Sequence, residues 1–303
     1  MSEDVCFKSG DAYCAGDLFL PEGKVPHAPL PAIVIGHGFS AVKEALVDAA
    51  GHLTGAGYAV LAIDYRTFGK SGGEPRGQLF PLNQVEDYRN AISYLETREE
   101  IDPNRIGIWG TSFAGGIVIY TAAFDRRVKA VVAQVPIVNG RRWMQAIRTS
   151  ELWLQLLDRL DADRRRRYET GESERVPVTG RIYDKAFCAM PADEQISSLV
   201  GMAPFVYTSW IPEITLESVE RVIEFNPESV IHLIAPRPLC VVTTTGYDMI
   251  HPIEHILDAY HKAGEPKRIV LLPYEELAFY GEPGIGVAMQ PAIEWFHQHI
   301  PVQ

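Results

Sequence analysis

The sequence lacks the features that define several protein classes. Its 303 residues include four cysteines, which form no CxxC pair and have no metal-type spacing. Neither a disulfide framework nor a metal site is therefore expected. No apolar run approaches the ~20 residues that a membrane-spanning helix needs. The first residues are acidic and contain no apolar segment, so the sequence predicts no secretory signal and a reduced, cytoplasmic location.

Basic charge is also scarce. The chain has 28 Lys and Arg residues against 39 Asp and Glu residues, a formal net charge of -11. Such a balance disfavours nucleic acid and anionic membranes as partners. The one basic run, Arg164 to Arg167, is flanked by acidic residues and is interpreted as a solvated helix face. We expect a small-molecule substrate, no nucleic acid and no membrane partner, and leave a homodimer open.

Apolar segments of strand length alternate with segments of helical period in residues 1–138 and 228–303. This alternation is typical of an α/β protein, with a mostly parallel central sheet and helices on both faces. Between these ranges, residues 139–227 carry amphipathic helical patterns instead. We interpret residues 139–227 as a helical cap inserted into the core. Strands are predicted at 13–20, 31–38, 57–66, 104–110, 128–138, 237–246 and 267–273.

The sharpest chemical signal is the segment Gly107 to Gly116. A predicted strand enters a Gly-Thr-Ser-Phe-Ala-Gly-Gly turn, and a predicted helix leaves it. Small residues two positions before and after Ser112, namely Gly110 and Ala114, are what a tight strand-to-helix turn requires if a serine stands at its apex. Ser112 is therefore predicted to be a nucleophile, with the start of the helix favouring a developing oxyanion.

Two further loops follow predicted strands at the same sheet edge. Gly36-His37-Gly38-Phe39 is expected to supply the backbone N–H of Phe39, which with the N–H of Phe113 would form an oxyanion hole. His37 is interpreted as a structural hydrogen-bonding residue rather than as the base, and it is also assigned to the substrate-binding residues. Asp248, just past the strand at 237–246, has the chain position of the triad acid.

Taken together, these motifs resemble those of the α/β-hydrolase superfamily from Tyr13 to His299. The finer resemblance is to the dienelactone-hydrolase-like and polyketide-transferase-like branch. It is carried by Gly36 to Phe39, by Asp64-Tyr65-Arg66 with Gly69 to Gly72, by the Ser112 turn and by Pro236-Arg237-Pro238. The resemblance implies an α/β-hydrolase fold and ester, thioester or lactone chemistry through an acyl-serine. The superfamily also contains lyases and non-catalytic receptors.

The resemblance also implies a catalytic histidine just after the last strand, where this chain has none. Alignment on Tyr280 and Gly281 places Glu276 there, with Glu275 one residue away. A carboxylate is a weak base at neutral pH unless burial raises its pKa, and beside Asp248 one of the two carboxyl groups is expected to hold a proton.

Three interpretations of the missing histidine stay open. In the first, Glu276 or Glu275 is the general base of a modified reaction. In the second, His251, in the loop of Asp248, restores the triad. His255 lies one helical turn further on. The third interpretation is a protein that binds a ligand without turning it over. His297 and His299 are interpreted as residues of the terminal helix face.

Aromatic residues of the predicted cap give the only hint of a substrate. We expect them to line an apolar pocket over Ser112 and so to favour a polyketide-like or other apolar acyl compound. The aromatic residues assigned to substrate binding are Trp143, Trp153, Tyr183 and Trp210. No cofactor or metal is expected. The sequence predicts a serine hydrolase or acyl transferase, with a lyase, a cyclase or a catalytically inactive binding protein as alternatives.

Overall fold

The computed structural model describes residues 2–21, 28–184 and 186–302. Its centre is an eight-stranded sheet with the strand order β1-β2-β4-β3-β5-β6-β11-β12. The strands are β1 (Ser2–Ser9), β2 (Ala12–Phe19), β3 (Leu30–Gly36), β4 (Ala59–Ile63), β5 (Ile101–Thr111), β6 (Ala130–Gln134), β11 (Leu239–Thr244) and β12 (Lys267–Leu272). β2 pairs antiparallel with β1 and β4, and the remaining pairs are parallel. The predicted mostly parallel sheet is confirmed.

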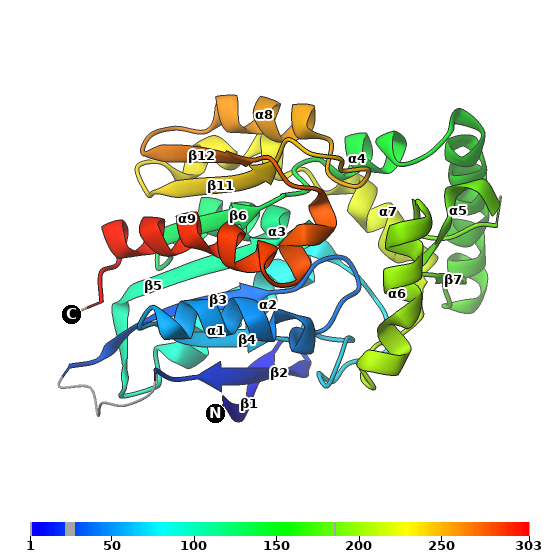
Figure 1. The fold of residues 1–303 in the computed structure, drawn as a ribbon. Helices are drawn as coiled ribbons and strands as arrows, with labels where there is room; N and C mark the ends of the chain where they lie inside the picture. The colour runs from blue at the N-terminus through cyan, green and yellow to red at the C-terminus, as the bar shows by residue number, and fades with distance from the viewer. Residues whose placement is uncertain (1, 22–27, 185, 303) are drawn as a thin grey trace.

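Helices cover both faces of this sheet (Figure 1). One face packs against α1 (Val47–Gly55) and α9 (Gly284–His299), and the other against α2 (Pro81–Leu95), α3 (Phe113–Phe124) and α8 (Ile253–Lys262). Along β3, Ile33 and Ile35 belong to the first core, while Ala32 and Val34 belong to the second. Successive side chains of a strand point to opposite faces, so a fully apolar strand is needed between two layers of helices.

The segment between β6 and β11 lies beside one end of the sheet, where Figure 1 shows α5, α6 and α7 stacked together. Its helices are α4 (Gly140–Ala146), α5 (Ser150–Thr170), α6 (Glu194–Val206) and α7 (Leu216–Glu224), and its short strands are β7 (Arg175–Pro177), β8 (Thr179–Arg181), β9 (Met190–Ala192) and β10 (Glu213–Thr215). β10 pairs with β7 and β8 pairs with β9, so two small sheets accompany the predicted helices. The boundaries of a separate cap stay a prediction.

Short 3-10 helices complete the described chain. They are η1 (Lys43–Leu46), η2 (Ile182–Asp184), η3 (Pro227–Ser229), η4 (Ile231–Ile234) and η5 (Glu276–Tyr280). Within the described ranges, none of the helices combines the length and the apolar character needed to cross a membrane.

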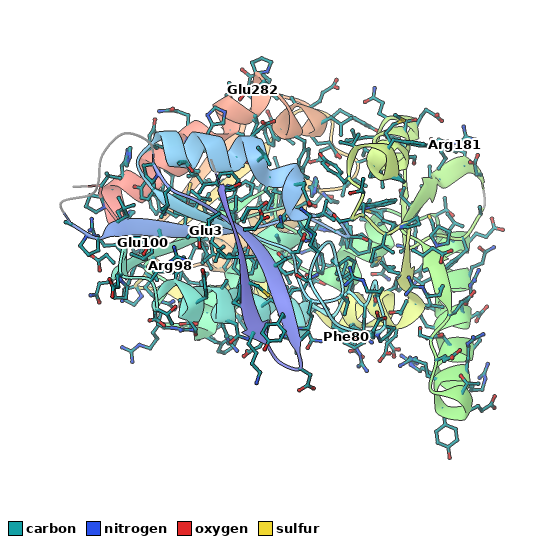
Figure 2. The ribbon with its side chains drawn as sticks, turned by 90° about the horizontal axis from the view of Figure 1, so that it is seen from below. Glu3, Phe80, Arg98, Glu100, Arg181 and Glu282 are labelled. Carbon is teal, nitrogen blue, oxygen red and sulfur yellow. The ribbon has the colours of Figure 1, made fainter. Side chains whose placement is uncertain are left out.

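The edge strand β1 was not predicted from the sequence. Val5 and Phe7 are buried, while Cys6 between them and Lys8 after them are exposed. Arg98 holds the strand to the core, because its guanidinium lies 2.8 Å from Glu3 and 2.5 Å from Glu100. Figure 2 labels these three residues close together. An antiparallel edge strand added in this way leaves the parallel centre, and the loops at its carboxyl end, unchanged.

Candidate active site

Ser112 stands at the apex of the turn between β5 and α3. Its backbone has φ 57 and ψ -121, in a region that non-glycine residues rarely occupy. The turn is held because Ser112 N donates to Gln134 O at 2.9 Å, while Ser112 O accepts from Gly115 N at 2.9 Å and from Ile137 N at 3.1 Å. A Cβ at Gly110 would lie 2.4 Å from Ala114 O, so only glycine fits there. The predicted strand–turn–helix unit is present.

His251 connects Ser112 with Asp248. The imidazole Nε2 lies 2.8 Å from Ser112 Oγ, and Nδ1 lies 3.0 Å from each carboxylate oxygen of Asp248. The loop after β11 folds back because Asp248 Oδ1 accepts from Ile250 N at 2.9 Å and from His251 N at 2.7 Å. His251 is only 3% exposed. The three side chains thus form an unbroken hydrogen-bonded chain from hydroxyl to carboxylate.

Glu276, which the alignment placed at the position of the missing histidine, is not the side chain next to Ser112 Oγ. The side chain beside Ser112 Oγ is His251, whereas the Glu276 carboxyl group lies beside Asp248 and His251, with one ligand atom of each residue within 4.8 Å of the others. Glu276 Oε2 accepts from Ile250 N at 3.3 Å and lies 3.9 Å from His251 Nδ1. The alignment was misleading because the loop turn at Asp248 directs a histidine only three residues later back toward the serine.

The two buried carboxyl groups differ in their protonation. Burial and the neighbouring Asp248 raise the pKa of Glu276 well above its ordinary range. Burial also disfavours the ionised form of Asp248, but the charge and hydrogen bonds of His251 outweigh it and lower the pKa of Asp248. Because two adjacent carboxylates repel, one proton resides on Glu276 while Asp248 is ionised. The sequence analysis also expected one of these two carboxyl groups to hold a proton.

Asp248, His251 and Glu276 also form a group whose possible ligand atoms all lie within 4.8 Å of one another in the described part of the chain. Spacing along the sequence could not reveal this group, since Glu276 reaches it only through the fold. The imidazole Nδ1 is already occupied by Asp248 at 3.0 Å, and both carboxyl groups accept the N–H of Ile250. We assign no metal to it.

The two backbone N–H groups predicted for the oxyanion hole belong to Phe113, at the start of α3, and to Phe39, in the loop after β3. The first helical residue, Phe113, has an N–H without an intrahelical acceptor, as at any helix start. The loop of Phe39 packs directly on the serine, because a Cβ at Gly38 would lie 3.1 Å from Ser112 Cβ. The rings of Phe39 and Phe113 contact each other at 5.8 Å between centroids. This arrangement suits an oxyanion hole beside Ser112 Oγ.

The loop that carries Phe39 is anchored by Asp64, at the end of β4. Asp64 accepts from Lys43 N at 2.8 Å and from Lys70 N at 2.9 Å. Burial raises the pKa of Asp64 to about 6, although these hydrogen bonds oppose the shift. A Cβ at Gly69 would collide with the Asp64 carboxyl group, and Gly69 has φ +51. The Asp-Tyr-Arg and Gly-Lys-Ser motifs therefore act by fixing the loop beside Ser112.

His37 is buried beneath this loop rather than open to a substrate. It is 1% exposed, its Nδ1 lies 3.0 Å from Gly38 O, and its ring contacts that of Tyr65 at 4.5 Å. Burial lowers the pKa of His37 to about 4, so the ring is neutral near pH 7. Its assignment to substrate binding is therefore corrected to a structural role at the end of β3.

The four aromatic residues assigned to the pocket occupy different environments. Trp143 is 1% exposed and donates from Nε1 to Ile250 O at 2.8 Å, so it supports the loop of His251 from below. Trp210 donates from Nε1 to Ser40 O at 2.8 Å. Trp153 is half-buried beneath Arg141, and Tyr183 is 87% exposed. Helical spacing alone could not separate these environments.

Two tyrosines near the site, Tyr247 and Tyr280, were assigned no role from the sequence. Tyr280 Oη lies 3.3 Å from Oγ1 of Thr111, the residue before Ser112. Tyr247 Oη donates to Asp193 Oδ2 at 3.0 Å and so joins the loop after β11 to the start of α6. A tyrosine in a loop carries no sequence signal for either contact.

The sheet order, the serine turn at the end of β5 and the acid and histidine after β11 define a protein of the α/β-hydrolase class. The family model described as X-Pro dipeptidyl-peptidase (S15 family) matches residues 14–191, more than half of the chain. The chain belongs to this family of α/β-hydrolase proteins, and within the superfamily to the polyketide-transferase-like branch.

Individual relatives agree with this placement. The polyketide transferase ATR5 of Stachybotrys chlorohalonatus is 30% identical over 271 residues, which cover 89% of this chain and 87% of that protein. The quorum-quenching protein AidA of Acinetobacter baumannii is 44% identical over 138 residues. That alignment covers 45% of this chain and 44% of AidA, so the chain spans under half of AidA's length. The solved α/β hydrolase GrgF from Penicillium sp. sh18 shares the fold, with a TM-score of 0.82 over 99% of both chains at 23% identity.

Proposed function

We propose that the protein is a serine-dependent acyl hydrolase or acyl transferase in which Ser112 is the nucleophile, His251 the general base and Asp248 the group that orients the base. The observation that carries the proposal is the 2.8 Å contact between His251 Nε2 and Ser112 Oγ, with Asp248 at 3.0 Å from the other ring nitrogen. A nucleophile, a base in hydrogen-bond reach and a third group behind the base are the three parts that acyl-serine chemistry requires.

The reaction proceeds in two balanced halves. Ser112 Oγ attacks the acyl carbon while its proton passes to His251 Nε2, and the carbonyl electron pair moves onto oxygen beside the N–H groups of Phe39 and Phe113. Collapse of this intermediate expels the alcohol, thiol or amine, which takes the proton from His251. Water or a second nucleophile then loses a proton to His251 and attacks the acyl carbon. The bond from that carbon to Ser112 Oγ breaks, and Oγ takes the proton back from His251, which restores both residues.

The substrate is proposed to be an ester, thioester or lactone of an apolar or aromatic acyl compound. Aromatic rings surround the candidate oxyanion hole, since Phe39 lies 5.8 Å from Phe113 and 5.4 Å from Trp143 between ring centroids. The name of the relative ATR5, a polyketide transferase, is compatible with such an acyl group. Residues 139–227 would act as the cap, because Trp210 and Asp193 of this segment contact the loops beside the site. Dimerisation and a cytoplasmic location stay predictions.

The test is turnover of a matched panel of chromogenic acyl esters, acyl thioesters, lactones and an X-Pro dipeptide anilide. The wild type is compared with Ser112→Ala and with Ser198→Ala, an exposed serine on α6. We expect hydrolysis of at least one acyl ester or thioester, loss of turnover in Ser112→Ala and no change in Ser198→Ala.

A fluorophosphonate supplies a second readout that does not depend on the substrate. It should label the wild type at Ser112 and leave Ser112→Ala unlabelled. A wild type that is folded, unlabelled and inactive on the whole panel would contradict the acyl-serine mechanism and favour ligand binding without turnover. Cleavage of the anilide alone would assign the protein a peptidase activity instead.

A further inference from the structure

Asp248 receives hydrogen bonds on both sides of its carboxyl group. Its Oδ1 accepts from the N–H groups of Ile250 and His251, and its two oxygens share the His251 ring at 3.0 Å. The Glu276 carboxyl group is a further neighbour, since one ligand atom each of Asp248, His251 and Glu276 lies within 4.8 Å of the others. Both side chains are 5% exposed, so water cannot separate their charges. A carboxyl group can satisfy Asp248 there only as a donor, which requires a proton.

We propose that Glu276 is a positioning residue that, as a neutral carboxylic acid, donates a hydrogen bond to Asp248 and holds it against His251; this inference rests on the triad role proposed for those two residues. Glu276 Oε2 accepts the N–H of Ile250 at 3.3 Å. A carboxylic acid has one O–H donor and keeps acceptor capacity, and the amide of glutamine offers the same two functions.

The backbone around Glu276 gives this contact a fixed geometry. Glu276 N donates to Tyr247 O at 3.1 Å, so the start of η5 is joined to the loop of Asp248. A Cβ at Gly246 would lie 2.1 Å from Tyr274 O, which shows how closely the two segments approach. On the opposite side, Trp143 holds Ile250 O. A side chain held between rigid segments can orient a neighbour without large entropic cost.

The other charges near Glu276 also favour its neutral form. Asp193, the N-cap of α6, faces it with a negative charge, as does Asp248. Tyr247 and Tyr280 are the neighbouring phenols, and both are neutral near pH 7. His251 is the remaining titratable group in the cluster, and it gains positive charge during the reaction. Ionised Asp248 stabilises that charge directly, whereas neutral Glu276 leaves Asp248 free to do so.

The test compares Glu276→Gln with Glu276→Ala, and uses Glu275→Gln as the matched control because Glu275 is the exposed neighbour. We expect Glu276→Ala to lose kcat by about 10- to 100-fold with little change in KM, as for other residues that orient a catalytic group. Glutamine keeps the donor and the acceptor, so Glu276→Gln should recover most of this loss. Glu275→Gln should match the wild type within about threefold.

Infrared difference spectra report the proton itself. The wild type and Glu275→Gln should show the C=O stretch of a buried protonated carboxylic acid at pH ~7, and Glu276→Gln should lack it. Absence of this band in the wild type, or inactivity of a folded Glu276→Gln protein that the fluorophosphonate still labels, would overturn the inference.

The two proposals fail in different ways. If Ser112 is neither labelled nor needed for turnover, the acyl-serine proposal fails, whatever the infrared band shows. If Ser112 is labelled and required but Glu276→Gln is as inactive as Glu276→Ala, only the role of Glu276 as a neutral donor fails.

Discussion

Asp248 and His251 lie three residues apart in one loop, and the imidazole Nδ1 is 3.0 Å from both oxygens of the carboxyl group. The backbone N–H of His251 binds the same carboxyl group at 2.7 Å, so the acid orients both the ring and the peptide of the histidine. The histidine thereby reaches Ser112 without a contribution from the segment after β12, which carries Glu276 instead.

Replacing His251 separates the two candidate bases. His251→Ala should lower kcat/KM by roughly 10⁴-fold, because Ser112 would lose the imidazole that lies in hydrogen-bond reach of its hydroxyl. His255→Ala, one helical turn further on, is the control and should stay within about threefold of the wild type. Ester hydrolysis at pH ~7 measures both. Full activity in His251→Ala would return the role of base to Glu276.

Trp143 is expected to support activity from beneath the site. Trp143→Phe keeps an aromatic ring but removes the donor to Ile250 O, and leaving a buried carbonyl unpaired costs about 1–3 kcal/mol. We expect a matching loss in the free energy of unfolding, measured by urea denaturation, and a lower kcat because the loop of His251 loosens. Trp153→Phe, beneath Arg141, should change neither quantity appreciably. Equal behaviour of the two variants would rule out a special role for Trp143.

Gly38 is predicted to be needed for catalysis more than for folding. The Cβ of Gly38→Ala would lie 3.1 Å from Ser112 Cβ and 3.5 Å from its Oγ, so the loop of Phe39 must shift away from the serine. Loss of one oxyanion donor typically costs about 10²- to 10³-fold in kcat. Gly51→Ala in α1 has no atom within 4 Å of the new methyl group and should instead stabilise the protein slightly. Esterase assays and thermal unfolding distinguish the two effects.

Asp64 should make stability depend on pH. Burial raises its pKa to about 6 in the folded protein, above the value of ~3.9 expected in the unfolded chain. The folded state therefore holds this proton more tightly, and the resulting stabilisation is complete below pH ~4 and lost as the pH rises through ~6.

Asp64→Asn removes the titrating carboxyl group, so this variant is the reference for the pH dependence of the wild type. Between pH ~5 and ~7.5, the wild type should lose roughly 1 kcal/mol more unfolding free energy than the variant. Urea denaturation of both proteins at each pH measures the difference. A difference that is constant with pH, or that grows in the opposite direction, would show that Asp64 is already ionised below pH ~5.

The sequence was most informative where local pattern and tertiary position coincide. Fully apolar strands such as 31–38 predicted the parallel sheet, and the small residues around Ser112 predicted its turn. The chain order also placed Asp248 after the strand at 237–246. Periodicity reports which faces of an element are buried, and chain order reports where it stands in a known topology. Periodicity and chain order together were therefore enough to predict the fold, the turn at Ser112 and the position of Asp248.

The choice between His251 and Glu276 could not be made in this way. It depends on the direction in which a short loop folds back, which is set by the hydrogen bonds that Asp248 accepts from Ile250 N and His251 N. The placement of Trp143 beneath that loop is equally invisible, because it depends on how α4 packs. Repulsion between carboxyl groups was predictable, since it needs only their proximity.

The loop after β11 concentrates two groups of the site in one short segment of the sequence. Asp248 and His251, proposed above as the orienting acid and the base, lie within four consecutive residues. In the proposed mechanism, the segment after β12 therefore need not supply the proton acceptor. An exchange of this one short loop would replace both proposed groups at once.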